Sequence, residues 1–151
     1  MEKNLTLEYR HYNSLETMPA EERELVEEAR KATQKAIADY SHFHVGAAAR
    51  LESGAIITGS NIESEVYPAG LCAERTLLYH HQATCPNDRI VALAIASDPS
   101  HRECYPCGQC RQVLHDVEKR QGLDLKVIMS GADSATVVER ASDLLPFTFS
   151  L

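Results

Sequence analysis

Apolar residues recur along the chain with helical spacing in some stretches and with strand spacing in others. After Pro19 and two glutamates the spacing is four, three and four residues, which predicts a helix with one apolar stripe that ends near Tyr40. The stripe consists of Leu25, Ala29, Ala32 and Ala36. Residues 45–51 then follow a period of two, and a Gly54 turn leads into residues 55–59, which predicts a β-hairpin.

The second half of the chain alternates predicted helices with predicted strands. Helices are expected at residues 72–83 and 107–121, and Gly122 ends the second one. Continuous apolar runs at residues 90–97 and 125–129 are typical of strands covered on both faces. A strand, a helix and a strand in this order imply a right-handed parallel crossover. The pattern predicts an α/β fold, in which a mixed sheet of about five strands carries helices on both faces.

The two ends of the chain carry weaker signals. Leu5, Leu7 and Tyr9 alternate with polar neighbours, so a short strand or a docked arm is expected there. Near the other end, residues 136–138 are expected to add an edge strand to the sheet.

Length and charge narrow the class of protein. A chain of 151 residues without a linker is expected to form one domain over residues 1–151, with residues 1–18 as an arm and residues 19–151 as the core. The net charge of −7 and the lack of a Lys and Arg cluster argue against a nucleic-acid groove, so a neutral small molecule is the expected partner. The chain has no run of about 18 apolar residues, so no membrane span is predicted. The N-terminus lacks the apolar stretch of a signal peptide, so a cytoplasmic, reducing location is expected.

Five cysteines in such a chain are expected to be metal ligands or buried thiols rather than disulfides. Cys107 and Cys110 are three residues apart, so they share one side of a helix start and can bind one ion. Cys72 begins the other helix, and two facing helix N-termini could hold a tetrahedral zinc ion with three thiolates. A catalytic zinc site leaves its fourth position to water, and Glu74 is close enough in sequence to sit beside that water.

Charge balance singles out Arg75. Three thiolates overcompensate a divalent ion and should make it a poorer Lewis acid. The helix N-termini contribute partial positive charge, and we hypothesise that Arg75 donates a hydrogen bond to a ligand sulfur and restores acidity to the bound water.

Two other interpretations of these cysteines stay open. A Cys-x-x-Cys pair also fits a redox motif, although this leaves Cys72 and Glu74 unexplained. A closed structural zinc site would need a fourth protein ligand, either Cys104 or one of the nearby histidines. Those histidines are His80, His81, His101 and His115. Cys85 and Cys104 are otherwise expected to be buried thiols.

Several motifs in order along the chain resemble the small zinc-dependent cytidine deaminases. The family's zinc motif is matched by Cys-Ala-Glu-Arg at 72–75 and by Pro-Cys-Gly-Gln-Cys-Arg-Gln-Val at 106–113. The resemblance extends to Tyr-Ser-His-Phe-His-Val-Gly-Ala-Ala at 40–48, to Asn-Ile-Glu at 61–63 and to Leu-Leu-Pro at 144–146. It implies a three-layer α/β/α cytidine-deaminase-like fold and the hydrolytic deamination of cytidine or deoxycytidine in pyrimidine salvage.

The resemblance also implies a role for each matching residue. Cys72, Cys107 and Cys110 would bind Zn²⁺, with Arg75 beside them, and Glu74 would carry the proton. The expected substrate contacts are Phe43 on the pyrimidine ring, Asn61 and Glu63 on the sugar hydroxyls, Ala73, and Phe149 from a neighbouring subunit. A homotetramer, or a dimer, with shared active sites is implied.

Two departures from the family pattern bear on the substrate. Ser64-Glu65 replaces the usual Asn-Ala, and Tyr105 stands where Ser or Thr is usual. A deaminase of a related aminopyrimidine nucleoside such as blasticidin S, and a zinc-stabilised binding module without catalysis, remain as alternatives.

Overall fold

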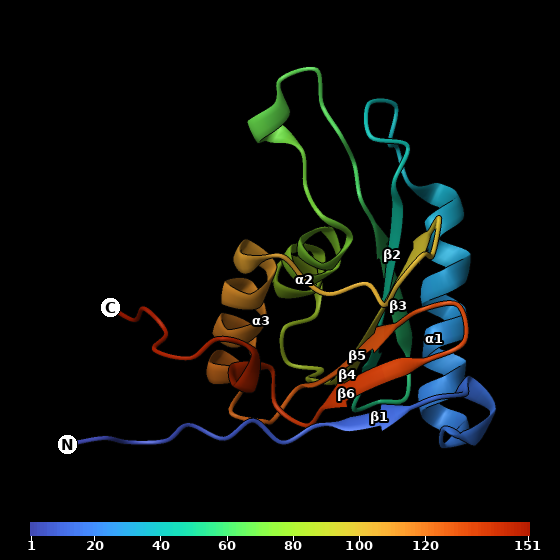
Figure 1. Cartoon of the computed structure of the whole chain (residues 1–151). Helices are drawn as coiled ribbons and strands as arrows, with labels where there is room; N and C mark the ends of the chain where they lie inside the picture. The colour runs from blue at the N-terminus through green and yellow to red at the C-terminus, as the bar shows by residue number, and fades with distance from the viewer.

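The computed structural model describes all 151 residues and has three layers, which confirms the predicted α/β class (Figure 1). One six-stranded sheet separates α1 on one face from α2 and α3 on the other. The helices are α1 (Ala20–Ala32), α2 (Ala73–Thr84) and α3 (Gly108–Gln121). The strands are β1 (Arg10–Tyr12), β2 (His44–Leu51), β3 (Ile56–Ser60), β4 (Ile90–Asp98), β5 (Lys126–Ser130) and β6 (Ala135–Val138). No helix is both long and apolar enough to cross a membrane.

The sheet order is β1-β6-β5-β4-β2-β3, and β4 and β5 form its one parallel pair, on either side of α3 in the sequence. The expected parallel crossover is therefore confirmed. The sheet has six strands instead of about five, because Arg10–Tyr12 pairs with β6 and occupies the edge that had been expected for residues 136–138. The pairing residues follow Leu5, Leu7 and Tyr9, which stay exposed.

Each face of the sheet has its own core. Val45, Ala47, Ala49 and Leu51 pack together against α2 and α3, as the period-two pattern predicts. The opposite face of β2 and β4 carries alanines, which let α1 come close to the sheet. Gly46 shows how close the contact is, since a Cβ atom there would lie 2.0 Å from the carbonyl oxygen of Ala29. No residue larger than glycine fits at this point of β2.

The helix after Pro19 ends earlier than expected. α1 stops at Ala32, a 3₁₀ turn covers Thr33–Lys35, and the chain is then extended at Ala36 and Ile37 before it turns at residues 39–41. The reason is a competing set of backbone hydrogen bonds. Ile37 N–H donates to the carbonyl oxygen of Asn61 at 3.0 Å, and Glu63 N–H donates to the carbonyl oxygen of Ile37 at 2.8 Å. This pairing brings the segment before β2 beside the segment after β3.

α2 and α3 start on the same side of the sheet, and a cysteine occupies the N-cap position of each. α2 approaches β3 at Gly59, where a Cβ atom would lie 2.7 Å from the carbonyl oxygen of Ala73. α3 ends at Gly122, whose φ of 66° gives the left-handed cap that the sequence predicts. The fold thus places two helix N-termini next to each other.

Candidate functional site

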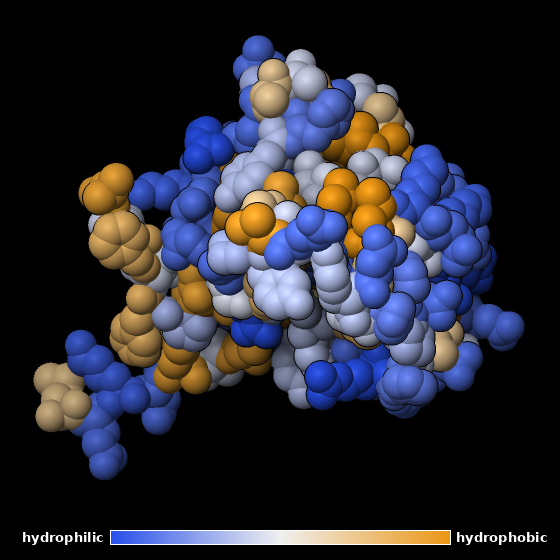
Figure 2. Space-filling view, turned by 90° about the horizontal axis from the view of Figure 1, so that it is seen from above, coloured by the Kyte–Doolittle hydropathy of each residue, from blue (hydrophilic) through white to orange (hydrophobic).

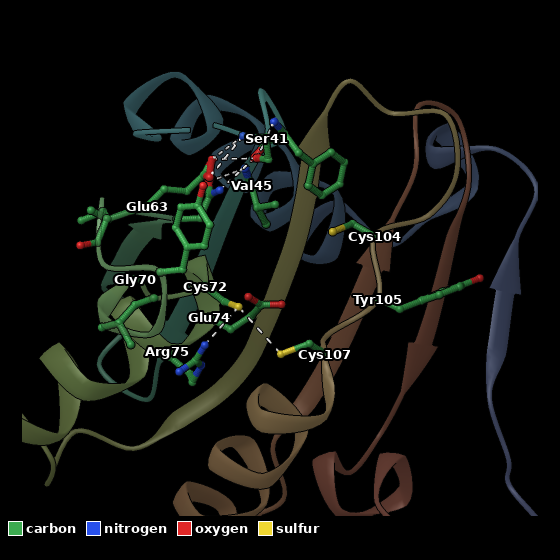
Figure 3. Close-up of a pocket in the computed structure, with 16 residues that line it drawn as sticks. Ser41, Val45, Glu63, Gly70, Cys72, Glu74, Arg75, Cys104, Tyr105 and Cys107 are labelled. Carbon is green, nitrogen blue, oxygen red and sulfur yellow. Dashed lines mark hydrogen bonds between the residues drawn. The ribbon is translucent and has the colours of Figure 1, made fainter. Parts of the chain in front are cut away.

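The three predicted metal ligands meet at these two helix N-termini. Cys72 is the N-cap of α2, Cys107 is the N-cap of α3, and Cys110 lies buried in the first turn of α3. Their Sγ atoms all lie within 4.8 Å of one another. Figure 3 shows two of them, Cys72 Sγ and Cys107 Sγ, which are 3.8 Å apart. Cys72 therefore forms one cluster of sulfur atoms with two cysteines that lie 35 or more positions further along the chain.

The cluster fits a zinc ion. Two thiolates that each lie 2.3 Å from a tetrahedral zinc ion are separated by about 3.8 Å, which is the distance between Cys72 and Cys107. Thiolate sulfur is also a donor that zinc prefers. No histidine and no fourth cysteine joins the group, so a closed site of four protein ligands is not formed. The donor set matches a zinc site that keeps one position open.

Arg75 supplies positive charge to the cluster. Its guanidinium donates a hydrogen bond of 3.4 Å to Cys72 Sγ, as the charge argument anticipated. A hydrogen bond from the Cys110 thiol and this one from Arg75 lower the pKa of Cys72 to about 5. Cys72 is therefore ready to act as a thiolate ligand at neutral pH. Both helix N-termini add partial positive charge at the same point.

Glu74 is a buried carboxyl group beside the sulfur cluster. The residue is 3% exposed, and Cys110 Sγ lies 3.6 Å from its Oε2. Burial raises the pKa of Glu74 to about 7, so protonated and ionised forms are both accessible near neutral pH. Figure 3 shows the carboxylate directed toward the space next to Cys72 and Cys107. A group with these properties can accept and return a proton.

A cavity of about 430 Å³ opens above the cluster and is lined by segments from both halves of the chain. Cys72, Glu74 and Arg75 form part of its wall, together with Cys107. Cys104 also lines the cavity, and burial raises the pKa of its thiol to about 12, but its sulfur does not join the group of three cysteines. A cavity of this size is in the range that holds small organic ligands.

Asn61 and Glu63 line the same cavity, and both already make hydrogen bonds within the protein. Asn61 Oδ1 accepts from the Val45 N–H at 2.7 Å, and its Nδ2 donates to the Phe43 carbonyl oxygen at 2.8 Å. Glu63 accepts from the Ser41 hydroxyl at 2.7 Å. Each side chain has hydrogen-bonding capacity left for a ligand, because an amide nitrogen carries two hydrogens and a carboxylate offers about four acceptor sites.

Three further substrate contacts were predicted, and one of them lines the cavity. Phe43 lines the cavity and is partly exposed. The methyl group of Ala73 is buried in the core between α2 and the sheet, so only its main chain can face a ligand. Phe149 is 71% exposed and does not line the cavity of its own chain. It lies on the C-terminal tail, which projects from the body of the molecule (Figure 1), and Figure 2 shows apolar residues standing out from the body on the same side.

Sequence reasoning missed the contact that Ser41 makes with Glu63 and the partner of the Tyr105 hydroxyl. Ser41 lies two residues before Phe43 in a matching motif, but nothing in the sequence shows that its hydroxyl reaches Glu63. Tyr105 lines the cavity, yet its side chain is directed away from Glu74, and its hydroxyl donates to Glu103 at 3.0 Å. Tyr67 also lines the cavity, and its ring meets that of Tyr40 edge to face, with the ring centroids 5.4 Å apart.

Comparisons with known proteins agree on one family. The family model described as the cytidine and deoxycytidylate deaminase zinc-binding region matches residues 19–121. A cytidine deaminase of Halalkalibacterium halodurans is 36% identical over 126 residues, which cover 83% of this chain and 92% of that protein. The crystal structure of cytidine deaminase from Burkholderia pseudomallei superposes with a TM-score of 0.74 at 35% identity and covers 87% of this chain and all of that one.

A blasticidin-S deaminase of Bacillus cereus is also similar, but over less of the chain. It is 32% identical over 99 residues, which cover 62% of this chain and 70% of that protein. The matched residues 19–121 include Cys72, Glu74, Arg75, Cys107 and Cys110. The chain therefore belongs to the cytidine and deoxycytidylate deaminase family of zinc-binding proteins.

Proposed function

We propose that this protein deaminates cytidine, deoxycytidine or both by hydrolysis, releasing ammonia and the corresponding uridine nucleoside. One observation carries the proposal. The buried Glu74 carboxyl group lies beside a three-thiol cluster that lacks a fourth protein ligand, at the wall of a cavity of about 430 Å³. The curated relatives that match most of the chain are named cytidine deaminases, which supports the same reaction.

Cys72, Cys107 and Cys110 would hold the zinc ion. When bound, zinc supplies a Lewis acid that lowers the pKa of a coordinated water molecule. Arg75 neutralises part of the thiolate charge through its hydrogen bond to Cys72 and so preserves that acidity. The N-termini of α2 and α3 act in the same direction.

Glu74 would move the protons of the reaction. It takes one proton from the attacking water, whose oxygen bonds to C4 of the pyrimidine, and gives this proton to N3. It then takes the second proton from the oxygen at C4 and gives it to the amino group. The C4–N bond breaks, ammonia leaves and the carbonyl group of uridine forms. The pKa of about 7 suits a group that both accepts and donates within one cycle.

The cavity wall provides the groups that would bind the nucleoside. Glu63 accepts from a sugar hydroxyl and Asn61 bonds to the same part of the sugar, since both have hydrogen-bonding capacity left. Phe43 packs on the pyrimidine ring. Ala73 contributes its main-chain N–H, which belongs to the first turn of α2, where such groups have no partner within the helix.

The exposed tail supports an assembly with shared active sites. Phe149 closes the cavity of a neighbouring subunit in a homotetramer or a dimer, because most of its surface is exposed in its own chain. Each subunit is one deaminase domain, with residues 19–151 as the catalytic core and residues 1–18 as an arm that adds β1 to the sheet. All five cysteines are free thiols, which suits pyrimidine salvage in the reducing cytoplasm.

An absorbance assay of the zinc-loaded protein tests this function. We expect turnover of cytidine or deoxycytidine, with ammonia released in equal amount, and little or none of cytosine or adenosine. Turnover of blasticidin S alone would favour the antibiotic deaminase instead. Zinc-loaded protein that acts on none of these compounds would indicate a binding module.

A further inference from the structure

The segment 104–106 leads directly into the proposed zinc ligand Cys107, and the body of the protein holds it at two points. Cys104 N–H donates to the carbonyl oxygen of Ser130 on β5 at 3.0 Å. Arg111 Nε donates to the carbonyl oxygen of Pro106 at 2.9 Å. Between these two anchors lies Tyr105, which the deamination chemistry does not use.

Glu103 provides a fixed point next to this segment. Its carboxylate is buried and accepts hydrogen bonds from the Ser134 hydroxyl at 2.8 Å and from the Thr136 hydroxyl on β6 at 2.7 Å. His11 on β1 places its Nδ1 3.5 Å from the same carboxylate. These contacts come from β1, from β6 and from the turn before β6, so the position of the carboxylate is set by elements outside the segment that leads to Cys107.

Tyr105 connects the segment to that fixed point. Its hydroxyl donates to Glu103 Oε2 at 3.0 Å, while its side chain is 53% exposed. Figure 3 shows the side chain directed away from Cys72 and Glu74. Because much of the ring lies in solvent, the hydroxyl supplies the directional contact of this side chain. A hydrogen bond to a carboxylate is stronger than one between neutral groups.

We propose that Tyr105 is a positioning residue of the metal centre, which holds the main chain before Cys107 in place through its hydrogen bond to Glu103. Loss of that bond lets the 105–107 segment move, and Cys107 Sγ then spends less time at the separation that zinc requires. Ser134, Thr136 and His11 hold Glu103 together, so the carboxylate keeps its place when one of these contacts is lost. The inference rests on the proposed role of Cys107 as a ligand, and it is independent of the substrate.

The variant Tyr105→Phe tests the proposal, since it removes the hydroxyl and keeps the ring. We expect its affinity for Co²⁺, measured by competition with a chromophoric chelator, to fall roughly five-fold, the effect of one hydrogen bond. The thiolate-to-Co²⁺ charge-transfer band should also change in position or intensity, because one sulfur is held less firmly. Circular dichroism confirms that the variant is folded.

Thr136→Val is the matched control. It removes a hydrogen bond to the same carboxylate, but the donor lies on β6 and the hydrogen bond from Tyr105 to Glu103 stays in place. Ser134 and His11 still hold Glu103 in this variant. We therefore expect thermal stability to fall in both variants and Co²⁺ affinity to fall only in Tyr105→Phe.

Unchanged Co²⁺ affinity and an unchanged spectrum in Tyr105→Phe would overturn the proposal, and Tyr105 would then contribute to stability alone. Equal losses of Co²⁺ affinity in both variants would overturn it as well, because a general loosening of the fold would explain them. The titration uses no nucleoside, so its result is independent of the deaminase assay.

Discussion

The Ser41 hydroxyl donates a hydrogen bond of 2.7 Å to Glu63 Oε1, and the Ser41 N–H lies 3.2 Å and 3.3 Å from the two carboxylate oxygens. The same hydroxyl accepts from the Phe43 N–H at 3.1 Å. One serine thus fixes both the carboxylate proposed to bind the sugar and the loop that presents the aromatic ring. Glu63 is oriented before any ligand arrives, which reduces the cost of ordering it on binding.

Replacing Ser41 with Ala should therefore weaken substrate binding without changing the chemical step. We expect KM for cytidine to rise roughly five-fold, as for the loss of one hydrogen bond, while kcat stays nearly constant. Steady-state kinetics measure both values. Ser41→Thr keeps the hydroxyl and should restore KM, since Ser41 is exposed and leaves room for a methyl group. A fall in kcat with constant KM would contradict this role.

Replacing Arg75 with Gln should lower turnover while zinc stays bound. The hydrogen bond from the guanidinium to Cys72 involves a charged group, so its loss is expected to cost roughly ten-fold in kcat. Zinc content, measured by atomic absorption, should stay near one per chain. Arg89→Gln removes an equal charge from an exposed pair with Glu52 and should leave kcat unchanged. Full activity of Arg75→Gln would show that the thiolate charge needs no such compensation.

Replacing Phe149 with Ala tests the shared active site. If Phe149 closes the cavity of a neighbouring subunit, kcat/KM for cytidine should fall about ten-fold, as for the loss of a buried aromatic contact at an interface. Phe147→Ala is the matched control, since Phe147 lies on the same tail and is fully exposed. Light scattering reports whether either variant changes the assembly. Equal kinetics of the two variants would argue against a specific role of Phe149.

The parts of the fold that were predicted correctly have strong local signals. The end of α3 follows from Gly122, whose left-handed conformation few other residues adopt. The end of α1 was predicted wrongly, because Ile37 pairs with the chain after β3, and no local pattern records that contact. β1 was not placed correctly either, since its three residues gain their strand conformation by pairing with β6.

The candidate site divides in a similar way. That the three cysteines and Glu74 come together could be predicted, because their positions at two helix starts follow from their spacing in the sequence. The orientation of Tyr105 could not, since Glu103 is fixed by Thr136, which lies 33 residues further along the chain. Asn61 was predicted to bind the sugar, but its bonds to the main chain of the Phe43 segment became visible only in the folded protein.

Replacing Glu74 with Gln should remove activity and keep the metal. The amide has nearly the same shape as the carboxyl group but cannot accept and return a proton, so kcat is expected to fall by about three orders of magnitude or more. Circular dichroism and zinc content should match those of the parent protein. Retained activity would show that another group carries the proton.

The Glu74→Gln variant also separates the effect of Glu74 on the pH dependence of stability from the effects of other groups. Burial raises the pKa of Glu74 from 4.5 to about 7 in the zinc-free fold, so folding favours its protonated form. That contribution is fully present below pH 4.5, decreases as the pH rises toward about 7, and is lost above it. Since each pKa unit corresponds to about 1.4 kcal/mol, the full decrease is about 3 kcal/mol.

The comparison must be made between the parent and Glu74→Gln, because the lowered pKa of Cys72 acts in the opposite direction. A thiol whose pKa falls on folding stabilises the fold at pH values above the pKa it has in the unfolded chain. This stabilisation is lost as the pH falls toward about 5. Both zinc-free proteins contain Cys72, so its effect largely cancels in their difference. We expect urea unfolding at several pH values to show the parent losing stability relative to Glu74→Gln between pH 4.5 and about 7, and a constant difference above that range. A difference that does not vary with pH would mean that Glu74 ionises in the fold as it does in water.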